Sequence, residues 1–468
     1  MFTFVRRSLL AATALSAGFL VSTGPATAAE AAPLSAGAPD APQGLDADEA
    51  SRGEVIIVTA RRRQETAQAV PLAISVIKAD SIESTGNFNV QKLQSLTPTL
   101  QVYSSNPRNT AVNIRGIGVP FGLTSDGFEQ GVGIYVDDVY NARVAAAVFD
   151  FLDVSQVEVL RGPQGTLYGK NTTAGAINIT TNQPTFSYEG RAEFSTGNLG
   201  LKQGKAAVSG PLSDTVAVRL AGAVTSRRGT IYNVTSRQWI NAQDNIGLRA
   251  QLLFKPTDRL SITLSGDYSV QDPECCGTVF VRTGLTQRAV ARQYDALVAA
   301  HNAQPGVAQY QVVSRNGFDR LTDLDSNLNA GNKIGGASLK VKWDLGAGTL
   351  TSVSAWRFWD WKPENDRDFT GLSIVAKSQN PSQQDQYSQE LRYNYSGKRI
   401  DVVAGGFLFH QRIDTQGTEQ QGSDASKWNL TGALANDPSV LNGLTARNVQ
   451  WLKATSAALF GQVSYKLT

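Results

Sequence analysis

Cysteine, methionine and histidine are nearly absent from this chain of 468 residues, which has two cysteines, one methionine and two histidines. The two cysteines, Cys275 and Cys276, are adjacent. A disulfide between neighbours is strained and uncommon, although an oxidising compartment would permit one, so we interpret the pair as a feature of a loop. With so few thiols and imidazoles, we predict no metal site and no covalently bound cofactor.

Strong net charge and long apolar runs are absent too. The formal net charge is +3, which argues against a nucleic-acid partner. Beyond residue 28 no stretch approaches the roughly 18 consecutive apolar residues of a transmembrane helix. The sequence is compatible with a transmembrane β-barrel, because each strand of such a barrel needs only about 9–11 alternating residues. The chain has neither a G-x-S-x-G nor an H-E-x-x-H pattern, and we predict that it is not an enzyme.

Residues 1–28 have the pattern of a secretory signal peptide. Arg6 and Arg7 precede an apolar run from Leu9 to Val21, and Ala26-Thr27-Ala28 supplies a small-x-small cleavage site. Residues 29–65 then read as a flexible tether, since the part up to residue 53 is rich in Ala, Pro, Gly and acidic residues. The tether is too short to hold a further folded domain.

The tether contains one β-prone segment, Glu54 to Ala60, with the apolar and β-branched run Val55 to Thr59. No nearby stretch offers it a hairpin partner, and a lone strand can recruit another chain by strand addition. The alternative is an ordinary first strand of the next domain. The basic run Arg61-Arg62-Arg63 reads as a solvated hinge, with contact to an acidic partner left open.

Residues 66–186 form a predicted compact α/β unit. Gly-rich turns separate short apolar segments that read as strands, and one segment ending before Pro98 has helical character. The predicted strands are Val70–Val76, Val112–Gly116, Gly133–Asp137 and Val157–Arg161, and the predicted helical stretch is Asp80–Leu96.

From residue 187 onward the pattern changes to long strands in which apolar and polar residues alternate. Ile246, Leu248 and Leu252, for example, alternate with Arg249 and Gln251. Tight turns alternate with long excursions at about 226–244, 272–331, 362–382 and 413–453. Short turns at one end and long loops at the other are typical of outer-membrane barrels, whereas a 60-residue loop is hard to accommodate in a soluble sandwich. We predict about ten antiparallel strands of a transmembrane barrel.

Four motifs make the chain resemble a TonB-dependent outer-membrane receptor. Glu54 to Ala60 resembles a TonB box, Asn113 to Gly118 and Tyr135 to Asp137 resemble plug motifs, and Val157 to Ile179 is the most specific match. The resemblance implies an N-terminal α/β plug domain (66–186) followed by an antiparallel transmembrane β-barrel (187–468). Such barrels have about 22 strands, so we expect only part of one, and expect that the chain alone does not insert stably. Heat-modifiable migration on a gel would contradict that expectation.

The resemblance also implies the site residues. The TonB box would comprise Glu54, Val55, Ile56, Ile57, Val58, Thr59 and Ala60. The plug motifs would contribute Arg115, Gly116, Asp137, Arg161, Gly162, Pro163, Gly165, Tyr168, Gly169, Asn171, Gly175 and Asn178. We expect Gly162, Gly165, Gly169 and Gly175 to serve turns and close backbone approach. Arg115 and Arg161 would either pair with carboxylates on barrel strands or stabilise the plug internally.

The implied function is energy-coupled uptake of a scarce, large solute across the outer membrane, with a ferric siderophore as the leading ligand. The implied partners are the C-terminal domain of TonB in the periplasm, outer-membrane lipid and the extracellular solute. Alternative ligands are an oligosaccharide, cobalamin or an aromatic compound. Trp356, Trp359 and Trp361 would form an interfacial girdle or stack on such a ligand. A passive porin, an adhesin and a non-functional receptor fragment are the competing functional interpretations, and no domain for transcriptional signalling is expected.

Overall fold

The computed structural model describes residues 55–86, 89–120, 126–274, 276–282, 287–306, 309–311 and 313–467. The predicted signal peptide, residues 29–54 of the predicted tether, Glu54 and Cys275 lie outside the described residues. Cys276 is disulfide-bonded. None of the helices in the described part of the chain is long and apolar enough to cross a membrane.

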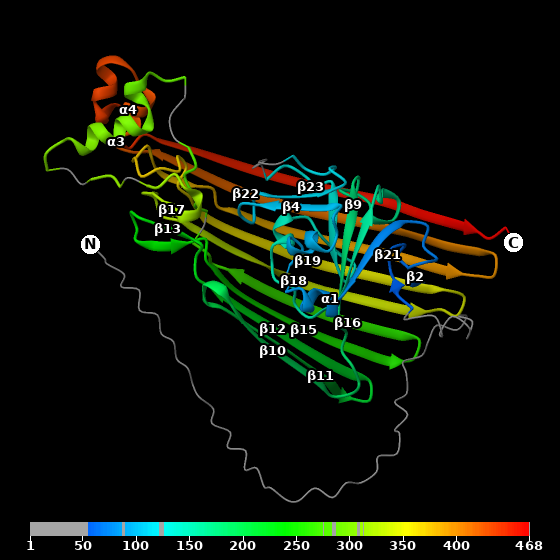
Figure 1. Ribbon diagram of the computed structural model, residues 1–468. Helices are drawn as coiled ribbons and strands as arrows, with labels where there is room; N and C mark the ends of the chain where they lie inside the picture. The colour runs from blue at the N-terminus through cyan, green and yellow to red at the C-terminus, as the bar shows by residue number, and fades with distance from the viewer. Residues whose placement is uncertain are drawn as a thin grey trace, which may run out of the picture. The chain divides into compact units, whose positions relative to one another are not determined.

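The α/β unit is built around a five-stranded sheet with the order β3-β8-β9-β6-β7 (Figure 1). Its strands β6 and β9 run parallel, and the other neighbours are antiparallel. A separate hairpin, β4-β5, and short helices complete the unit. The elements are β3 (Ala73–Lys78), α1 (Ala79–Ser84), η1 (Lys92–Ser95), β4 (Leu100–Ser104), β5 (Thr110–Ile114), β6 (Val132–Val136), β7 (Val139–Asn141), η2 (Val144–Ala147), β8 (Val154–Arg161), α2 (Gly165–Tyr168) and β9 (Gly175–Thr181).

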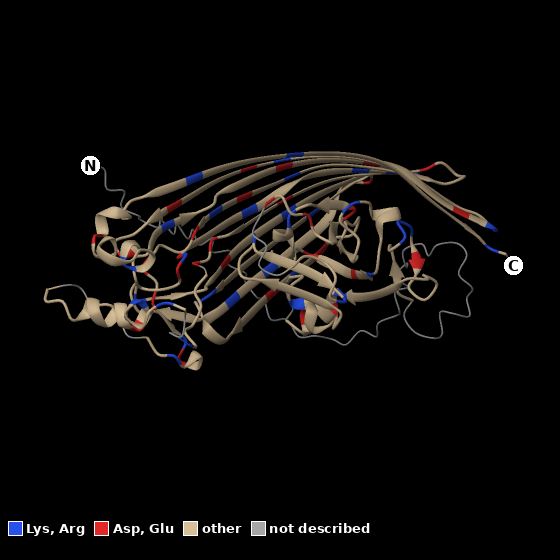
Figure 2. Ribbon diagram, turned by 90° about the horizontal axis from the view of Figure 1, so that it is seen from above, with Lys and Arg blue, Asp and Glu red and all other residues tan. Residues whose placement is uncertain are grey.

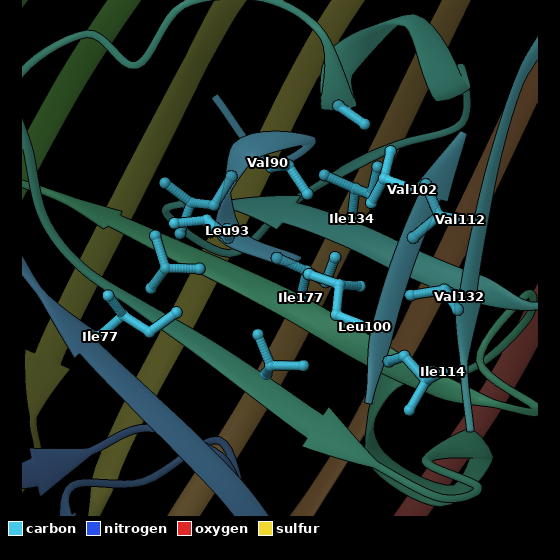
Figure 3. Close-up of a cluster of buried hydrophobic side chains, with 14 of the residues drawn as sticks. Ile77, Val90, Leu93, Leu100, Val102, Val112, Ile114, Val132, Ile134 and Ile177 are labelled. Atoms are coloured by element: carbon cyan, nitrogen blue, oxygen red, sulfur yellow. The ribbon is translucent and has the colours of Figure 1, made fainter. Parts of the chain in front are cut away.

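Branched apolar side chains from the sheet, the hairpin and the short helices meet in one core (Figure 3). Ile77, Leu93, Val112, Ile134 and Ile177 come from five different elements and lie together in this cluster. The four predicted strands are therefore confirmed within a few residues. The predicted helical stretch Asp80–Leu96 is wrong as a single helix, because α1 ends at Ser84 and only the four residues of η1 resume a helical turn.

Eleven strands form one long antiparallel sheet in which neighbours along the chain pair with each other. Ten of these strands correspond to the strands predicted from residue 187 onward. The eleventh, the short β20, pairs with the C-terminal part of β22. They are β10 (Glu189–Gly197), β11 (Leu201–Ser213), β12 (Val216–Arg227), β15 (Gln243–Thr257), β16 (Leu260–Gln271), β18 (Asn329–Asp344), β19 (Thr349–Glu364), β20 (Val375–Gln379), β21 (Ser382–Ser396), β22 (Ile400–Gln421) and β23 (Thr445–Tyr465).

The long sheet buries its polar face and exposes its apolar face. On β15, Ile246 and Leu248 are 50% and 58% exposed, whereas Arg249 and Gln251 are 8% and 3% exposed. A water-soluble sandwich would bury the apolar face instead. Apolar residues outside and polar residues inside are the arrangement of a barrel wall in lipid, which confirms the predicted class.

Tight turns and long excursions alternate along the sheet as predicted. The excursions contain β13 (Ile231–Asn233), β14 (Gln238–Ile240), β17 (Leu321–Thr322), η4 (Val290–Arg292), α3 (Tyr294–Asn302), η5 (Gly317–Asp319), α4 (Ala425–Asn429), η6 (Gly432–Asn436) and η7 (Pro438–Val440). The helices α3 and α4 lie within two of these excursions and add to the predicted pattern of strands, turns and loops. The last predicted loop, 413–453, is too long, because β22 continues to Gln421 and β23 begins at Thr445.

The α/β unit lies against the polar face of the long sheet, which curves around it (Figure 2). Charged side chains line this face, and an apolar contact accompanies them. Trp359 and Trp361 are 2% and 1% exposed, stack with ring centroids 6.4 Å apart, and pack in a cluster with Ala145 and Phe149 of the α/β unit. The girdle interpretation is therefore wrong for these two tryptophans; Trp356 is 39% exposed on the other face.

Candidate functional site

The N-terminal segment, residues 55–60, is docked on the α/β unit. Its strand β1 (Ile57–Val58) pairs antiparallel with β2 (Glu65–Thr66), a hairpin partner that the sequence pattern does not reveal. Val58 and Ala60 are fully buried in a cluster with side chains of both the α/β unit and the long sheet. The expectation of a flexible tether with a lone strand is therefore wrong for residues 55–65.

A buried carboxylate holds the backbone of the N-terminal segment. Glu158 on β8 is fully buried and accepts a hydrogen bond from the Thr59 amide at 2.8 Å. The side chain of Gln156, two residues away on the same face of β8, donates to the Ile57 carbonyl at 3.2 Å. Asn178 pairs with Glu158 across the sheet and donates to the Thr59 hydroxyl at 2.8 Å. Thr59 is thus the centre of the docking contacts.

Docking of the N-terminal segment should depend on pH through Glu158. Burial raises the pKa of this carboxyl above its ordinary 4.5, although hydrogen bonds from Thr59, Asn178 and Gln156 oppose the rise. The docked state thus binds the proton more tightly than the released state, so docking weakens as the pH rises from 4.5 through the raised pKa, and is constant above it. We expect hydrogen exchange at the Thr59 amide, corrected for intrinsic rate, to show this dependence and Glu158→Gln to remove it. An unchanged profile in that variant would contradict the assignment.

Arg62 is buried directly after the N-terminal segment. It is 4% exposed, and its guanidinium lies 4.1 Å from the ring centroid of Tyr168 and 4.9 Å from that of Tyr135. It donates to Asp138 of the α/β unit at 2.9 Å and lies 3.7 Å from Glu390 of β21. Burial lowers the pKa of Arg62, but Glu390, Tyr168 and Asp138 together outweigh it and raise the pKa, so the side chain is charged.

The neighbours of Arg62 are paired as well. Arg61 and Arg63 both form ion pairs with Glu65 of β2, and Arg63 lies 3.3 Å from Asp401 of β22. The interpretation of this basic run as a solvated hinge is wrong. The acidic partners left open by the sequence lie within the chain itself, on β2, β21 and β22.

Carboxylates of the α/β unit pair with cations of the long sheet. Asp153 pairs with Arg219, Asp137 pairs with Arg249, and the Asp138 carboxylate accepts from Lys340 at 2.6 Å. Burial raises the pKa of Asp138, but Lys340, Arg392 and Arg62 outweigh burial and hold the pKa well below its ordinary value. The two units are therefore held together by carboxylates on one and basic residues on the other.

The predicted pairing of Arg115 and Arg161 with barrel carboxylates is wrong. Arg115 is exposed in a turn with a φ of 55°, and Arg161 donates to the Ile74 carbonyl of β3 at 3.2 Å. Arg161 thus stabilises the plug internally, the second of the two roles expected for it. Where the prediction had basic plug residues pairing with acidic wall residues, the structure has acidic plug residues pairing with basic wall residues. The acidic residues come from the hairpin turn between β6 and β7.

That turn consists of only two residues, Asp137 and Asp138, with φ of 49° and 73°. Two-residue hairpins require this backbone conformation, which Asp tolerates better than most residues. Both carboxylates consequently leave the sheet together and reach the wall strands. An Asp-Asp pair between two apolar runs was the sequence signal for this contact. Of the residues that make these contacts, the expected site residues included Asp137 but not Asp138, Arg62 or Glu158, although Glu158 lies within the motif Val157 to Ile179.

The other motif residues surround the docked segment or shape the turns near it. Tyr168 lies under Arg62, and Asn171 donates to the Tyr140 hydroxyl at 2.7 Å. Gly116, Gly162 and Gly169 have φ of 76°, 100° and 74°, which suits glycine. Gly175 lies where a Cβ would be 2.2 Å from the Leu160 carbonyl oxygen. Gly165 has neither constraint, and Pro163 is exposed, so their expected roles find no support.

A polar cavity of about 1110 Å³ lies at the loop end of the sheet, between the loops of the α/β unit and the wall. The described part of the lining contains Arg108, Arg227, Arg367 and Arg447 together with Asp366 and Glu419, which gives four positive against two negative charges, a formal excess of +2. Eight asparagines of the described lining, which can donate and accept, accompany them: Asn89, Asn106, Asn109, Asn241, Asn245, Asn365, Asn380 and Asn448. This lining suits a hydrophilic ligand rich in oxygen atoms.

The cavity and the docked segment are far apart along the wall. Asn380, two residues before β21, lines the cavity, whereas Glu390 and Asn394 of β21 contact Arg62. Ten residues of extended chain, the separation of Asn380 and Glu390, span about 33 Å. The two features therefore lie toward opposite ends of the α/β unit.

Three carboxylates beside the cavity, Asp325, Asp366 and Asp368, have oxygen atoms within 4.8 Å of one another. Oxygen ligands of this kind suit a hard divalent cation. Burial and mutual repulsion raise the pKa of Asp325 and Asp366, and several of their oxygens accept backbone hydrogen bonds, for example from the Phe369 amide at 2.7 Å. None of the sequence motifs included this group.

Comparison with known proteins covers both units. Residues 66–176 match the family described as TonB-dependent Receptor Plug Domain. The pesticin receptor of Yersinia pestis is 30% identical over 175 residues, 37% of this chain and 25% of that protein. The ferrioxamine B receptor of Salmonella typhimurium is 27% identical over 244 residues, 49% of this chain and 32% of that protein.

Solved structures resemble the whole fold. The ferric yersiniabactin uptake receptor of Yersinia pestis superposes with a TM-score of 0.60 at 18% identity, covering 86% of this chain and 63% of that one. The ferripyoverdine receptor of the outer membrane of Pseudomonas aeruginosa superposes with a TM-score of 0.59 at 14% identity, covering 87% and 51%. At these identities the likeness shows the fold alone.

The polar-inside sheet and the α/β unit packed on it define a plugged barrel wall of the bacterial outer membrane. The plug-domain match identifies the α/β unit as a plug domain, and the related receptors make the chain similar to TonB-dependent receptors. The chain covers between a quarter and a third of the length of the curated relatives named above.

Proposed function

We propose that this receptor carries out energy-coupled uptake of a large, oxygen-rich solute, with a ferric siderophore as the leading ligand. The observation that carries the proposal is the docked N-terminal segment, because a paired but short β-strand held by a few polar contacts is suited to release and strand addition. In this proposal the segment is the TonB box, comprising Glu54 to Ala60, and the C-terminal domain of TonB is its partner.

The ligand class is supported by the cavity and by the names of relatives. Receptors for ferrioxamine B and ferripyoverdine are among the related proteins. The excess of arginine in the cavity favours a ligand with anionic oxygens. Among the described lining residues, Tyr103 and Phe369 supply the aromatic rings, which makes an aromatic compound the weaker alternative.

Uptake should depend wholly on residues 54–60. The receptor would be produced in a Gram-negative host that lacks its own siderophore receptors, and supplied with radiolabelled iron bound to hydroxamate, catecholate or carboxylate siderophores. Deletion of residues 54–60 should reduce uptake to background while surface binding of the ligand persists. Uptake that continues after the deletion, or in a host without TonB, would overturn the proposal in favour of a passive pore.

Ligand binding should depend on the unpaired arginines of the cavity. Arg227 and Arg447 line the cavity and form no ion pair with a described carboxylate. Hydrogen bonds to charged groups are worth about 1.5–3 kcal/mol, so Arg227→Ala with Arg447→Ala should weaken binding of the transported siderophore at least tenfold. Arg412, paired with Asp414 and outside the cavity lining, is the matched control. Equal affinity in the double variant would show that the ligand does not use these side chains.

A further inference from the structure

A single buried carboxylate, Asp126, connects the plug with both the cavity and the wall. It lies between β5 and β6 and is 5% exposed. Its Oδ1 accepts from Nε of Arg108 at 2.8 Å and its Oδ2 accepts from Nη2 of Arg108 at 3.2 Å, which makes a bidentate ion pair. Of the described residues that line the cavity, Arg108 is the only basic one from the plug. Asp126 therefore acts on the charge that the plug presents to the cavity.

Two hydroxyls of the wall fix the same carboxylate. Ser382, the first residue of β21, donates to Oδ2 of Asp126 at 2.8 Å, and Thr415 of β22 donates to it at 2.7 Å. Both hydroxyl residues are buried. Together with the two bonds from Arg108, four donors reach a carboxylate that offers about four lone pairs. Asp126 consequently cannot turn away from Arg108 without losing its bonds to the wall.

Asp126 is ionised at neutral pH. Burial alone would raise the pKa of its carboxyl above the ordinary 3.8, but the hydrogen bonds and charge of Arg108, with the hydroxyls of Thr415 and Ser382, outweigh burial and lower the pKa. The negative charge of Asp126 therefore cancels the positive charge of Arg108.

Arg108 is held from a second side by Asn380. In the amide orientation that satisfies both of its polar atoms, the Asn380 side-chain oxygen accepts from Nη2 of Arg108 at 2.7 Å and from Nη1 at 2.9 Å. Asp126 and Asn380 together occupy four of the five N–H groups of the guanidinium. One N–H group is left for a ligand.

The arginines of the wall are in a different state. Arg367 lies 3.7 Å from Glu419, but Arg227 of β12 and Arg447 of β23 form no ion pair with a described carboxylate. Six strands separate β12 from β23 in the sheet, which curves around the plug (Figure 2). The unpaired positive charge of the described lining thus lies on the wall, at two separate places.

We infer that Asp126 is a specificity-determining residue of the cavity: it cancels the charge of Arg108, so that anionic oxygens bind to the wall arginines and not to the plug. An anion at Arg108 would have to displace a carboxylate that is already fixed by the wall, whereas Arg227 and Arg447 present guanidinium groups without such a competitor. Asp126→Asn would give the plug face a positive charge while keeping the size of the side chain. The meaning for a transported ligand rests on the proposed function, whereas this distribution of charge does not.

Labelling with phenylglyoxal, a reagent for arginine side chains, tests the inference on the purified receptor in detergent, with peptide mass analysis to assign each site. Asp126→Asn should speed labelling of Arg108 at least tenfold, because the guanidinium loses its ion pair, and should change labelling of Arg227 and Arg447 less than about twofold. Asp385→Asn is the matched control, since Asp385 accepts from Trp356 and lies outside the cavity lining. An unchanged rate at Arg108 in Asp126→Asn would overturn the inference.

Inorganic phosphate serves as the anion in a second measurement. In the wild type, phosphate should slow labelling of Arg227 and Arg447 and leave labelling of Arg108 unaffected. In Asp126→Asn it should slow labelling of all three arginines. Protection of Arg108 in the wild type would show that the plug does present an available cation, and lack of protection at both wall arginines would show that they do not bind anions. Either result would overturn the inference.

A general loosening of the plug is recognised at Arg219, which pairs with Asp153 elsewhere between plug and wall. Faster labelling of Arg219 in Asp126→Asn would mark a merely structural role for Asp126 and count against the inference. Should Asp126→Asn fail to fold, Thr415→Val removes one wall bond to the carboxylate and should speed labelling of Arg108 about threefold. No change in Thr415→Val would contradict fixation of Asp126 by the wall. Because no siderophore is used, failure of the transport proposal leaves these results readable.

Discussion

Asp138→Ala is expected to weaken the attachment of the plug to the barrel wall by about 3 kcal/mol, the lower range for removing one partner of a buried ion pair. The carboxylate binds Lys340 and Arg62 directly, and Arg392 lies 3.8 Å away. Without it, three cations face one another, with Glu390 as the remaining carboxylate near two of them. Asp138→Asn keeps the size and shape of the side chain but removes its charge, and it should show most of the loss of attachment free energy.

The change is measurable through the buried tryptophans. Trp359 and Trp361 of the wall pack against Ala145 and Phe149 of the plug, so separation of plug and wall should alter their fluorescence. A denaturant titration should show this transition at lower concentration in the variant. Asp214→Ala, in the exposed turn between β11 and β12, is the control. An unchanged midpoint would mean that other pairs hold the plug.

The sign of the pH dependence supplies a second check on Asp138. Its carboxyl has a pKa well below the ordinary 3.8, so its contribution is complete above that value and is lost as the pH falls below it. The difference in denaturant midpoint between wild type and Asp138→Ala should therefore become smaller at acidic pH. The pKa of Glu158 is shifted in the opposite direction, upward, so exchange at the Thr59 amide in Glu158→Gln should differ most from wild type above pH 4.5.

The barrel class could be predicted from sequence because strand periodicity is local. Alternation of Leu248 and Arg249 assigns opposite faces to neighbouring residues, and loop lengths then distinguish a membrane wall from a sandwich. Which face meets lipid and which meets protein is fixed by the same pattern. The extent of β22 and β23 beyond the predicted ends was missed, since polar residues facing a cavity resemble those of a loop.

The docking of Arg62 could not be read from the sequence. Three consecutive arginines usually mark a solvated stretch, and the ion-pair partners of Arg62, Asp138 and Glu390, lie 76 and 328 positions away. Nothing local distinguishes Arg62 from Arg61. Glu158 was the more accessible signal, because a single charge within the apolar strand Val157–Leu160 requires a partner in the folded state.

Gly175→Val is expected to prevent the plug sheet from forming. Gly175 begins β9 in the middle of the sheet, paired with Arg161 of β8 on one side and Val132 of β6 on the other. A Cβ there would lie 2.2 Å from the Leu160 carbonyl oxygen and 2.7 Å from Ile114, and φ is 155°, a conformation that β-branched residues rarely adopt. The backbone oxygen cannot move without breaking the β8–β9 pairing.

The substitution should lower the free energy of unfolding of the plug by more than about 4 kcal/mol, a loss that is typical of severe steric conflicts in a packed core. Hydrogen exchange should show loss of protection in β8 and β9, and limited proteolysis should cleave the plug while the wall strands persist. Gly165→Ala, ten residues earlier in the same motif, is the matched control: its Cβ would meet nothing within 4 Å and its φ is negative, so the sheet should be unaffected. Equal protection from exchange in Gly175→Val and Gly165→Ala would contradict this prediction, because it would show that β8 and β9 can move apart at Gly175 without loss of the sheet. The close β8–β9 packing would then not explain how Glu158 of β8 is positioned under the N-terminal segment.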